Sequence, residues 1–348
     1  MAYSAITKAA DYFNTLLYSG NSSVRSLTGV GFEPSWVWIK ERTSTSDHML
    51  FDQPRGVEKY MSSNQDTIEQ TSSSMLTAFD SDGFSLGSGN DVNDNGQTYV
   101  SWNWKGNGAG SSNTDGSINT TTTSANTTSG VSISTYTGTG SAATVGHGLG
   151  VVPEMLIVKQ RTGTQWWFVY HIGMGNDRQG SLNTTNAESG GSSAYWNSTT
   201  PTSSVFSVGT DGATNGSGED LVAYAFAPVK GFSKFGKYTG NGSSNGTFVY
   251  TGFSPAFVMV KRIDNTGHWI MKDNKRPGYN PNDYYIWADA ADVETSASSV
   301  GMDLFSNGFK LTGNAGNTNA SGGSYIYMAF AQSPLVANVD GGLPATAR

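Results

Sequence analysis

The sequence contains no cysteine and comparatively few charged residues. Of its 348 residues, 14% are charged and none is cysteine, whereas charged residues make up about 25% of a typical soluble domain. The lack of cysteine excludes a disulfide framework, cysteine-based zinc sites and a cysteine nucleophile. The low charge means that serine, threonine, asparagine and glycine must form much of the surface.

Three further absences exclude classes of function. The chain has a net charge of −7 and no run of lysine or arginine, so the electrostatic footprint of a nucleic-acid-binding or anionic-membrane-binding protein is missing. No apolar run approaches the roughly 18 residues that a membrane-spanning helix needs. Residues 1–8 lack the basic region and apolar core of a signal peptide. We therefore expect no nucleic-acid partner and no membrane insertion.

The residue types that usually carry chemistry form no recognisable motif. The four histidines are not spaced as metal-ligand pairs, and no Gly-x-Ser-x-Gly sequence stands in the context of a nucleophile elbow. Residues 80–83 resemble the front of a calcium loop, but the later ligands do not follow. We expect no catalytic residue, metal or cofactor, although scattered carboxylates such as Asp52 and Asp273 could converge in the fold.

The sequence does contain one unit that is repeated three times. Residues 30–40 recur as residues 149–159 and as residues 250–261, each time with a proline, an apolar run and a closing lysine. The prolines and the lysines are separated by the same 119 and 102 positions: Pro34, Pro153 and Pro255, and Lys40, Lys159 and Lys261. A period of about 100 residues is that of a domain rather than of a solenoid turn.

The repeat predicts the domain organisation. We expect three units with a linker between the first two, flanked by an arm and a tail. The predicted boundaries are residues 1–11 (N-terminal arm), 12–105 (first unit), 106–130 (linker), 131–230 (second unit), 231–333 (third unit) and 334–348 (C-terminal tail). The linker is rich in glycine, serine, threonine and asparagine, which is typical of a flexible tether, but its threonines are equally compatible with an extended edge segment.

Hydrophobic periodicity predicts β structure within each unit. Segments such as residues 36–40 are short, apolar on both faces and rich in β-branched and aromatic residues, so we expect central strands that are covered on both sides. The predicted fold class is all-β, with three tandem antiparallel β-sandwich repeats of the jelly-roll or concanavalin-like kind. Residues 4–17 and 65–79 have partial helical spacing.

The segment that follows each apolar run is the candidate binding surface, because it combines basic and aromatic residues. Exposed aromatic rings could stack on sugar rings. The candidate glycan-stacking residues are Trp166, Trp167, Trp269, His268 and His48. The alternative is that these side chains fill the core and that the neighbouring arginines pair with acids. Repetition favours this alternative, since a structural strand must recur in every unit and a binding site need not.

The first unit resembles a repeated β-domain of uncharacterised marine bacteriophage virion proteins. The resemblance is carried by residues 11–15, 18–21, 29–40, 48–56, 79–84 and 99–105. The second and third units have diverged further, and the third keeps only Arg276-Pro277-Gly278 of the element that ends the 48–56 segment. The family is often described as tail-fibre-like or structural, and it supplies no catalytic motif.

The resemblance implies a non-enzymatic virion structural protein, assembled in the host cytoplasm and exposed on the particle exterior. We expect a tail fibre or host-recognition protein first and a capsid decoration or head-fibre protein as the alternative. The expected partners are other virion proteins, a homotrimer of this chain and a host surface glycan. The rival from another class is a glycan depolymerase on a tailspike, which would need carboxylates that meet in a groove. A free array of carbohydrate-binding modules is disfavoured because no signal peptide is seen.

Overall fold

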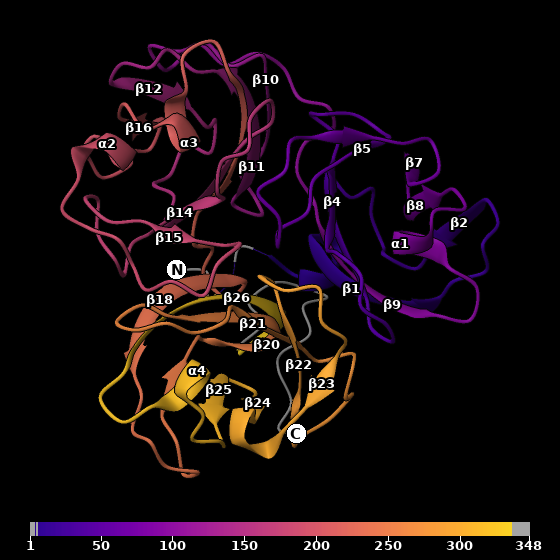
Figure 1. Ribbon diagram of the computed structural model, residues 1–348. Coiled ribbons are helices and arrows are strands. Elements are labelled where there is room, and N and C mark those ends of the chain that lie inside the picture. The colour runs from indigo at the N-terminus through magenta and orange to yellow at the C-terminus, as the bar shows by residue number, and fades with distance from the viewer. Residues whose placement is uncertain (1–3, 5, 336–348) are drawn as a thin grey trace.

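The computed structural model describes residue 4 and residues 6–335 and consists mainly of antiparallel strands (Figure 1). The helices among the described residues are single turns of three or four residues. The predicted all-β class is therefore confirmed. Residues 1–3 and 5 of the predicted arm, and residues 336–348 of the predicted tail, lie outside the described residues.

The elements follow one another in a similar order in the three units. The first unit contains η1 (Ala9–Asp11), β1 (Phe13–Ser19), β2 (Arg25–Thr28), β3 (Trp36–Glu41), β4 (Met49–Asp52), β5 (Lys59–Tyr60), β6 (Gln70–Thr71), β7 (Leu76–Asp80), β8 (Gly83–Leu86), α1 (Asn90–Asn93) and β9 (Thr98–Trp104). The linker and second unit contain β10 (Thr122–Asn126), β11 (Val131–Thr137), β12 (Ala143–Gly146), β13 (Met155–Gln160), β14 (Phe168–His171), β15 (Gly180–Ser181), α2 (Ser193–Trp196), β16 (Val205–Val208), α3 (Gly212–Asn215) and β17 (Asp220–Phe226). The third unit contains β18 (Ser233–Thr239), β19 (Phe248–Tyr250), β20 (Phe253–Arg262), β21 (Ile270–Asp273), β22 (Tyr284–Trp287), β23 (Thr295–Ser296), η2 (Ser298–Val300), β24 (Met302–Phe305), β25 (Gly308–Leu311), α4 (Gly316–Asn319) and β26 (Ser324–Pro334).

The same strand order occurs in the main sheet of each unit. The shared orders are β1-β9-β3-β4, β11-β17-β13-β14 and β18-β26-β20-β21, and all of these pairs are antiparallel. Each unit also has a smaller sheet: β2-β8-β7, β12-β16 and β19-β25-β24. The sequence repeat is thus also a repeat of topology.

Alternate residues of each central strand face two different cores. In β3, Val37 and Ile39 belong to the apolar cluster of the first unit, whereas Trp36 and Trp38 belong to a cluster that all three units share. A strand buried on both faces needs apolar side chains at every position. The prediction that the apolar runs are covered on both sides is confirmed, and the second cover is a neighbouring unit.

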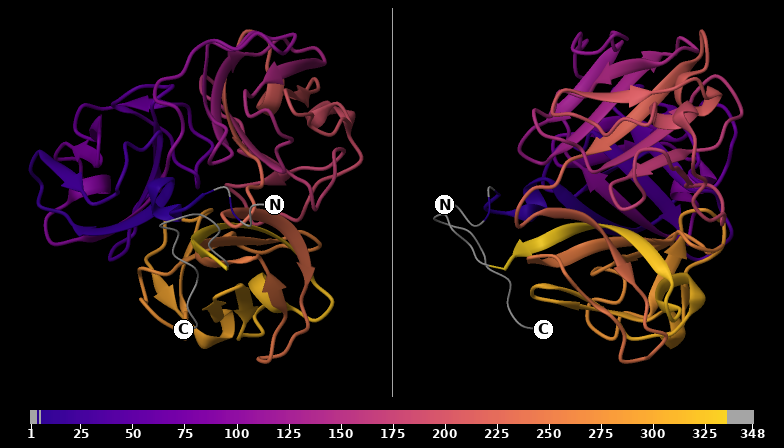
Figure 2. Two further views of the ribbon diagram at one scale, coloured as in Figure 1. Left: turned by 180° about the vertical axis from the view of Figure 1, so that it is seen from behind. Right: turned by 90° about the vertical axis from the view of Figure 1, so that its left-hand side faces the viewer.

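The three units form lobes around a common centre (Figure 2), and their main sheets contribute aromatic rings to it. Trp36 of the first unit stacks on Tyr224 of the second, with ring centroids 4.7 Å apart. Trp104 meets Phe330 of the third unit edge-on at 5.8 Å, and Phe226 of the second unit lies 6.2 Å from the same ring. Such contacts add about 0.5–1.5 kcal/mol each to the stabilisation from burial.

Two local expectations come out differently. The helix that the spacing of residues 4–17 indicated is not formed, because the described part of this segment contains only the short turn η1 and then β1. Residues 65–79 contain β6 and most of β7 instead of a helix. Within the 106–130 linker, β10 pairs with β11 along its whole length. The edge-segment alternative therefore holds for residues 122–126.

Candidate functional site

Each unit donates the same backbone hydrogen bond to the next unit around the ring. The three bonds, each from a glutamate N–H to a carbonyl oxygen, are Glu69 to Arg161 (2.8 Å), Glu188 to Ile263 (2.9 Å) and Glu294 to Arg42 (3.0 Å). The donors lie in the first, second and third units, and the acceptors lie in the second, third and first. A head-to-tail contact of this kind closes into a ring, and here the ring closes within one chain.

Two of the three boundaries add an ion pair to this backbone bond. At the first, Arg161 Nε and Nη2 donate to Glu69 Oε2 and Oε1 at 2.9 Å each. At the last, Arg42 Nη2 donates to Glu294 Oε1 at 2.7 Å. Burial alone would raise the pKa of Glu69, but the hydrogen bond from Arg161 lowers it, so this carboxylate is charged at neutral pH. Bidentate pairs that are largely buried are stronger than exposed ones.

The boundary between the second and third units lacks this pair. Ile263 stands where the other two boundaries have an arginine, and Glu188 bonds to Arg178 of its own unit at 3.0 Å. The second carboxylate oxygen of Glu188 is buried and has no hydrogen-bond partner. Burial accordingly raises the pKa of Glu188. The ring is therefore symmetric in its backbone bonds and asymmetric in its charges.

A fully buried Asp–Arg pair stands behind the first of these glutamates. Arg55 donates to the Asp52 carboxylate and reaches Glu69 Oε2 at 3.3 Å. The hydroxyl of Tyr224, from the second unit, donates to Asp52 Oδ2 at 2.7 Å. Asp52 thus serves the boundary between units and is not open to solvent.

The third unit repeats this arrangement, and the second replaces it. Arg276 donates to Asp273 and to Glu294 (3.1 Å), and Trp102 Nε1 of the first unit donates to Asp273 Oδ2 at 3.1 Å. In the second unit, His171 occupies the corresponding end of its strand and bonds to a carbonyl of the third unit at 3.0 Å. Asp52 and Asp273 lie at different boundaries, so the structure does not bring these two carboxylates together.

Three of the predicted glycan-stacking residues are inserted into a neighbouring unit. His48, Trp167 and Trp269 stand eight positions after the repeated lysines, and each is at most 2% exposed. Their ring nitrogens bond to backbone carbonyls of the adjacent unit: His48 Nε2 to Trp287 (2.9 Å), Trp167 Nε1 to Ser62 (3.0 Å) and Trp269 Nε1 to Ser181 (2.9 Å). These rings pack at the boundaries, and none offers an open face to a sugar.

The other two predicted stacking residues are accessible. The Trp166 side chain is 42% exposed. The His268 ring lies parallel to Trp287 with centroids 4.0 Å apart, and its Nδ1 bonds to Asp289 Oδ2 at 2.8 Å. The exposed fraction of the His268 side chain is 29%. Trp166 and His268 occupy the same position in the second and third units, one residue before the inserted tryptophan.

The repeated lysines are buried and donate to backbone carbonyls. Lys159 Nζ donates to the carbonyl of Asp66 in the first unit at 3.2 Å, and Lys261 Nζ donates to that of Thr185 in the second at 3.1 Å. Burial lowers the pKa of Lys40, Lys159 and Lys261 to about 8. Lys159 and Lys261 thus fasten a loop of the preceding unit, whereas Lys40 Nζ donates to the carbonyl of Glu41 in its own unit at 2.6 Å.

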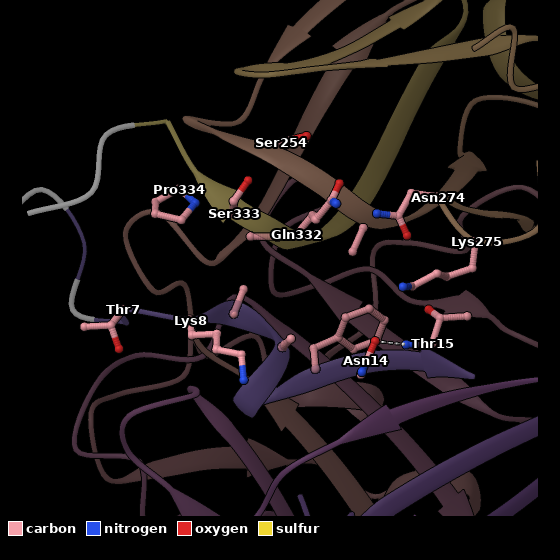
Figure 3. Close-up of a pocket in the computed structure, with 15 residues that line it drawn as sticks. Thr7, Lys8, Asn14, Thr15, Ser254, Asn274, Lys275, Gln332, Ser333 and Pro334 are labelled. Carbon is pink, nitrogen blue, oxygen red and sulfur yellow. Dashed lines mark hydrogen bonds between the residues drawn. The ribbon is translucent and has the colours of Figure 1, made fainter. Parts of the chain in front are cut away.

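A cleft of about 460 Å³ opens between the first and third units, near the described chain ends (Figure 3). Lys8 and Lys275 stand on its two sides, and η1, β1, β20 and β26 contribute its walls. Two buried side-chain oxygens in its lining, Thr15 Oγ1 and Asn274 Oδ1, have no hydrogen-bond partner.

Sequence reasoning missed the glutamates that fasten the ring. Glu69, Glu188 and Glu294 are separated by 119 and 106 positions, so the third falls out of step with the proline and lysine series. A local signal was present, because each follows an Asn or Asp by five positions. The side chains of these Asn and Asp residues accept the backbone N–H of the inserted residues: Asn64 from His48 (3.0 Å), Asn183 from Trp167 (3.0 Å) and Asp289 from Trp269 (2.9 Å).

A family described as a domain of unknown function (DUF7483) matches residues 8–334 of this chain. The chain belongs to the DUF7483 family. The match runs through all three units as one piece, so the DUF7483 domain corresponds to the whole ring and not to a single repeat. No curated protein and no solved structure matches the chain.

Neither a group of metal ligands nor a membrane-spanning helix is found in the described part of this DUF7483 ring. Among residues 4 and 6–335, no group of three or more His, Cys, Asp or Glu side chains is placed to hold a metal ion. Within the same residues, no helix is long and apolar enough to cross a membrane.

Proposed function

We propose that this DUF7483 chain is a non-enzymatic structural protein on the exterior of a bacteriophage particle, most directly a tail fibre or host-recognition protein. The proposal of a structural role is supported by the three boundaries, at each of which one unit donates the same backbone hydrogen bond to the next. The side chains that could have served chemistry, such as Asp52, Asp273 and His48, are used to hold units together. The resemblance of the first unit to marine bacteriophage proteins supports the virion location.

We also propose that each unit is an antiparallel β-sandwich of the jelly-roll or concanavalin-like kind. The support is clearest in the first unit, where one apolar cluster contains Val37 and Ile39 of the main sheet together with Leu27, Phe84 and other residues of the smaller sheet. Facing sheets with a shared apolar interior are the defining feature of a sandwich.

The rival activity, a glycan depolymerase, requires two carboxyl groups that flank an accessible substrate bond. Asp52 and Asp273 are fully buried, and each is paired with its own arginine. Protonating such a carboxyl, or exposing it to substrate, would break a buried pair at a cost of about 3–5 kcal/mol. The arrangement thus supports a display role over hydrolysis.

The predicted homotrimer stays a prediction. The structure adds a physical alternative, because the head-to-tail contacts that a homotrimer would make between chains are already made between the three units of one chain. Light scattering coupled to size-exclusion chromatography separates the two states, since the monomer has a mass of 36.8 kDa.

Immunogold labelling of intact particles with an antibody to this chain tests the proposed location. Label at the tail or its distal tips supports host recognition. Label spread over the head would instead assign the capsid-decoration role. Intact particles without label, in a preparation where the antibody detects the denatured chain by blotting, would contradict the virion proposal.

A further inference from the structure

Strand β1 has an open edge, whereas its counterpart in the second unit is paired. Both strands stand at the same place in their sheets, beside β9 and β17 respectively. In the second unit, β10 adds to the outer edge of β11, from Thr122 opposite Thr135 to Asn126 opposite Val131. Within the part of the chain that the structure describes, β1 is the last strand of its sheet in the first unit, and β18 is likewise the last strand in the third. An uncovered edge is a template for pairing with another strand.

The backbone of β1 is oriented for such pairing. Lys105 N–H donates to the Tyr12 carbonyl, and the alternation of an antiparallel ladder then points the backbone groups of Phe13, Thr15 and Leu17 away from β9. These three residues correspond to positions 131, 133 and 135 of β11, which are covered by β10. The N–H of Thr15 already donates to Asn14 Oδ1 at 3.0 Å, so the N–H of Leu17 is the outward donor that a docking strand would use.

No described residue of the first unit fills the place that β10 takes in the second unit. A Cβ added to Gly148 would lie 3.1 Å from the side chain of Ala125 in β10, whereas one added to the corresponding Gly29 would meet nothing within 4 Å. A hollow of about 610 Å³, lined by residues 16–21 and 25–28, runs beside β1 at this place. The cleft between the first and third units is lined by the preceding residues of β1, Phe13 to Thr15.

The cleft also indicates the charge of the occupant. A strand docked as β10 docks would run antiparallel to β1, so its C-terminal end would lie near Phe13. There Lys275 lies on one side of the cleft, and Lys8, whose Nζ is paired with Asp11 Oδ1 at 2.8 Å, lies on the other. Thr15 Oγ1 and Asn274 Oδ1, both buried without a partner, face the same region. A carboxylate at that end of the strand would complement Lys275, and polar side chains would complement the unpaired oxygens.

We propose that the edge of β1 is a docking site for an extended strand of another protein, with small polar side chains and a carboxylate at its C-terminal end. The bound strand takes the place that β10 takes on β11. Backbone hydrogen bonds supply the affinity in this mode of recognition, and side-chain pockets supply the specificity. This inference rests on the fold and does not depend on the proposed virion role.

The test uses the full chain and a fluorescein-labelled peptide of residues 119–126, which contains β10 and ends in a free carboxylate. Fluorescence anisotropy should show saturable binding. Leu17→Pro removes the outward N–H without removing a bond to β9, and it should weaken binding about ten-fold or more. The matched control Leu17→Ala keeps the N–H and should stay within about two-fold of the unmodified chain.

A second variant guards against a folding defect in the proline variant. Thr28→Trp places a large ring in the hollow beside β1 and should block the peptide while the thermal unfolding midpoint stays unchanged. The peptide amide should bind about two- to five-fold more weakly than the free acid. That difference should vanish when Lys8→Gln and Lys275→Gln are combined.

Several results would overturn the proposal. They are an absence of saturable binding, or binding that neither Leu17→Pro nor Thr28→Trp weakens. A dimer that forms with rising concentration in sedimentation velocity, and that Leu17→Pro abolishes, would assign the edge to a second copy of this chain instead of a foreign strand.

Discussion

Glu69 and Arg161 are 92 positions apart in the sequence and form a two-bond ion pair, with both N–O distances at 2.9 Å. The same glutamate also donates its backbone N–H to the carbonyl of Arg161. Main chain and side chain therefore fasten the same two residues across the boundary between the first and second units. The Glu294–Arg42 contact repeats this arrangement between the third unit and the first.

Glu69→Gln should destabilise the chain by about 2–3 kcal/mol, because it leaves Arg161 and the fully buried Arg55 with less compensating charge. The matched substitution Glu188→Gln should cost less than about 1 kcal/mol, since no arginine of the third unit pairs with Glu188. Urea unfolding followed by tryptophan fluorescence measures both. Equal losses would contradict the asymmetry of the ring.

Trp166 and Trp167 are neighbours with opposite environments, and substitution should separate them. Trp167→Ala empties a fully buried site and removes the bond to Ser62, so it should cost about 3–5 kcal/mol of unfolding free energy. Trp166→Ala should change stability by less than about 0.5 kcal/mol and should reduce any glycan binding on an array. If Trp166→Ala and His268→Ala leave glycan binding unchanged, the stacking prediction fails.

Acid should destabilise the chain in steps set by buried histidines. Burial lowers the pKa of His48 to about 3 and that of His171 to about 4, whereas an unfolded histidine titrates near 6.5. The unfolded state therefore binds protons first, and the unfolding free energy falls as the pH drops from about 6.5 towards 4. His48→Gln should flatten this slope. A flat profile over this range in the unmodified chain would contradict the buried, neutral state.

Moderately alkaline pH should stabilise the chain, in contrast to acid, over a limited pH range. Burial lowers the pKa of Lys40, Lys159 and Lys261 to about 8, while an unfolded lysine titrates near 10.4. Between these values the unfolded state binds more protons, so the unfolding free energy rises with pH. Above about pH 10, buried tyrosines such as Tyr170, whose pKa burial raises to about 12, reverse the trend. Denaturant melts from pH 7 to 11 should show this maximum, and a steady decline from pH 7 would contradict it.

The sequence predicted the strands of this fold better than it predicted which parts of the protein pack against them. Trp36-Val37-Trp38-Ile39 has no polar position, so both the β period and the double burial could be predicted from one segment. What covers the second face could not be predicted, because period alone does not distinguish a facing sheet from another unit. The same limit affected Trp167, whose aromatic character suits an exposed platform and a buried contact equally well.

The boundary residues escaped prediction for a different reason. Glu69 lies between β5 and β6, and Glu294 lies between β22 and β23. The segments that lead to them differ in length, so the two glutamates do not share the spacing of the proline and lysine series. Their partners, Arg161 and Arg42, were expected to pair with nearby acids, but the acids belong to another unit. Only the ring arrangement brings them together, and that arrangement depends on contacts far apart in the sequence.

Differential scanning calorimetry of the full chain tests the central claim, that three units form one structure through a shared aromatic core and closed boundaries. We expect one transition, with the calorimetric and van't Hoff enthalpies in agreement, and Glu69→Gln should shift the whole transition to lower temperature. Three separable transitions, of which Glu69→Gln moves only the first unit's, would contradict it.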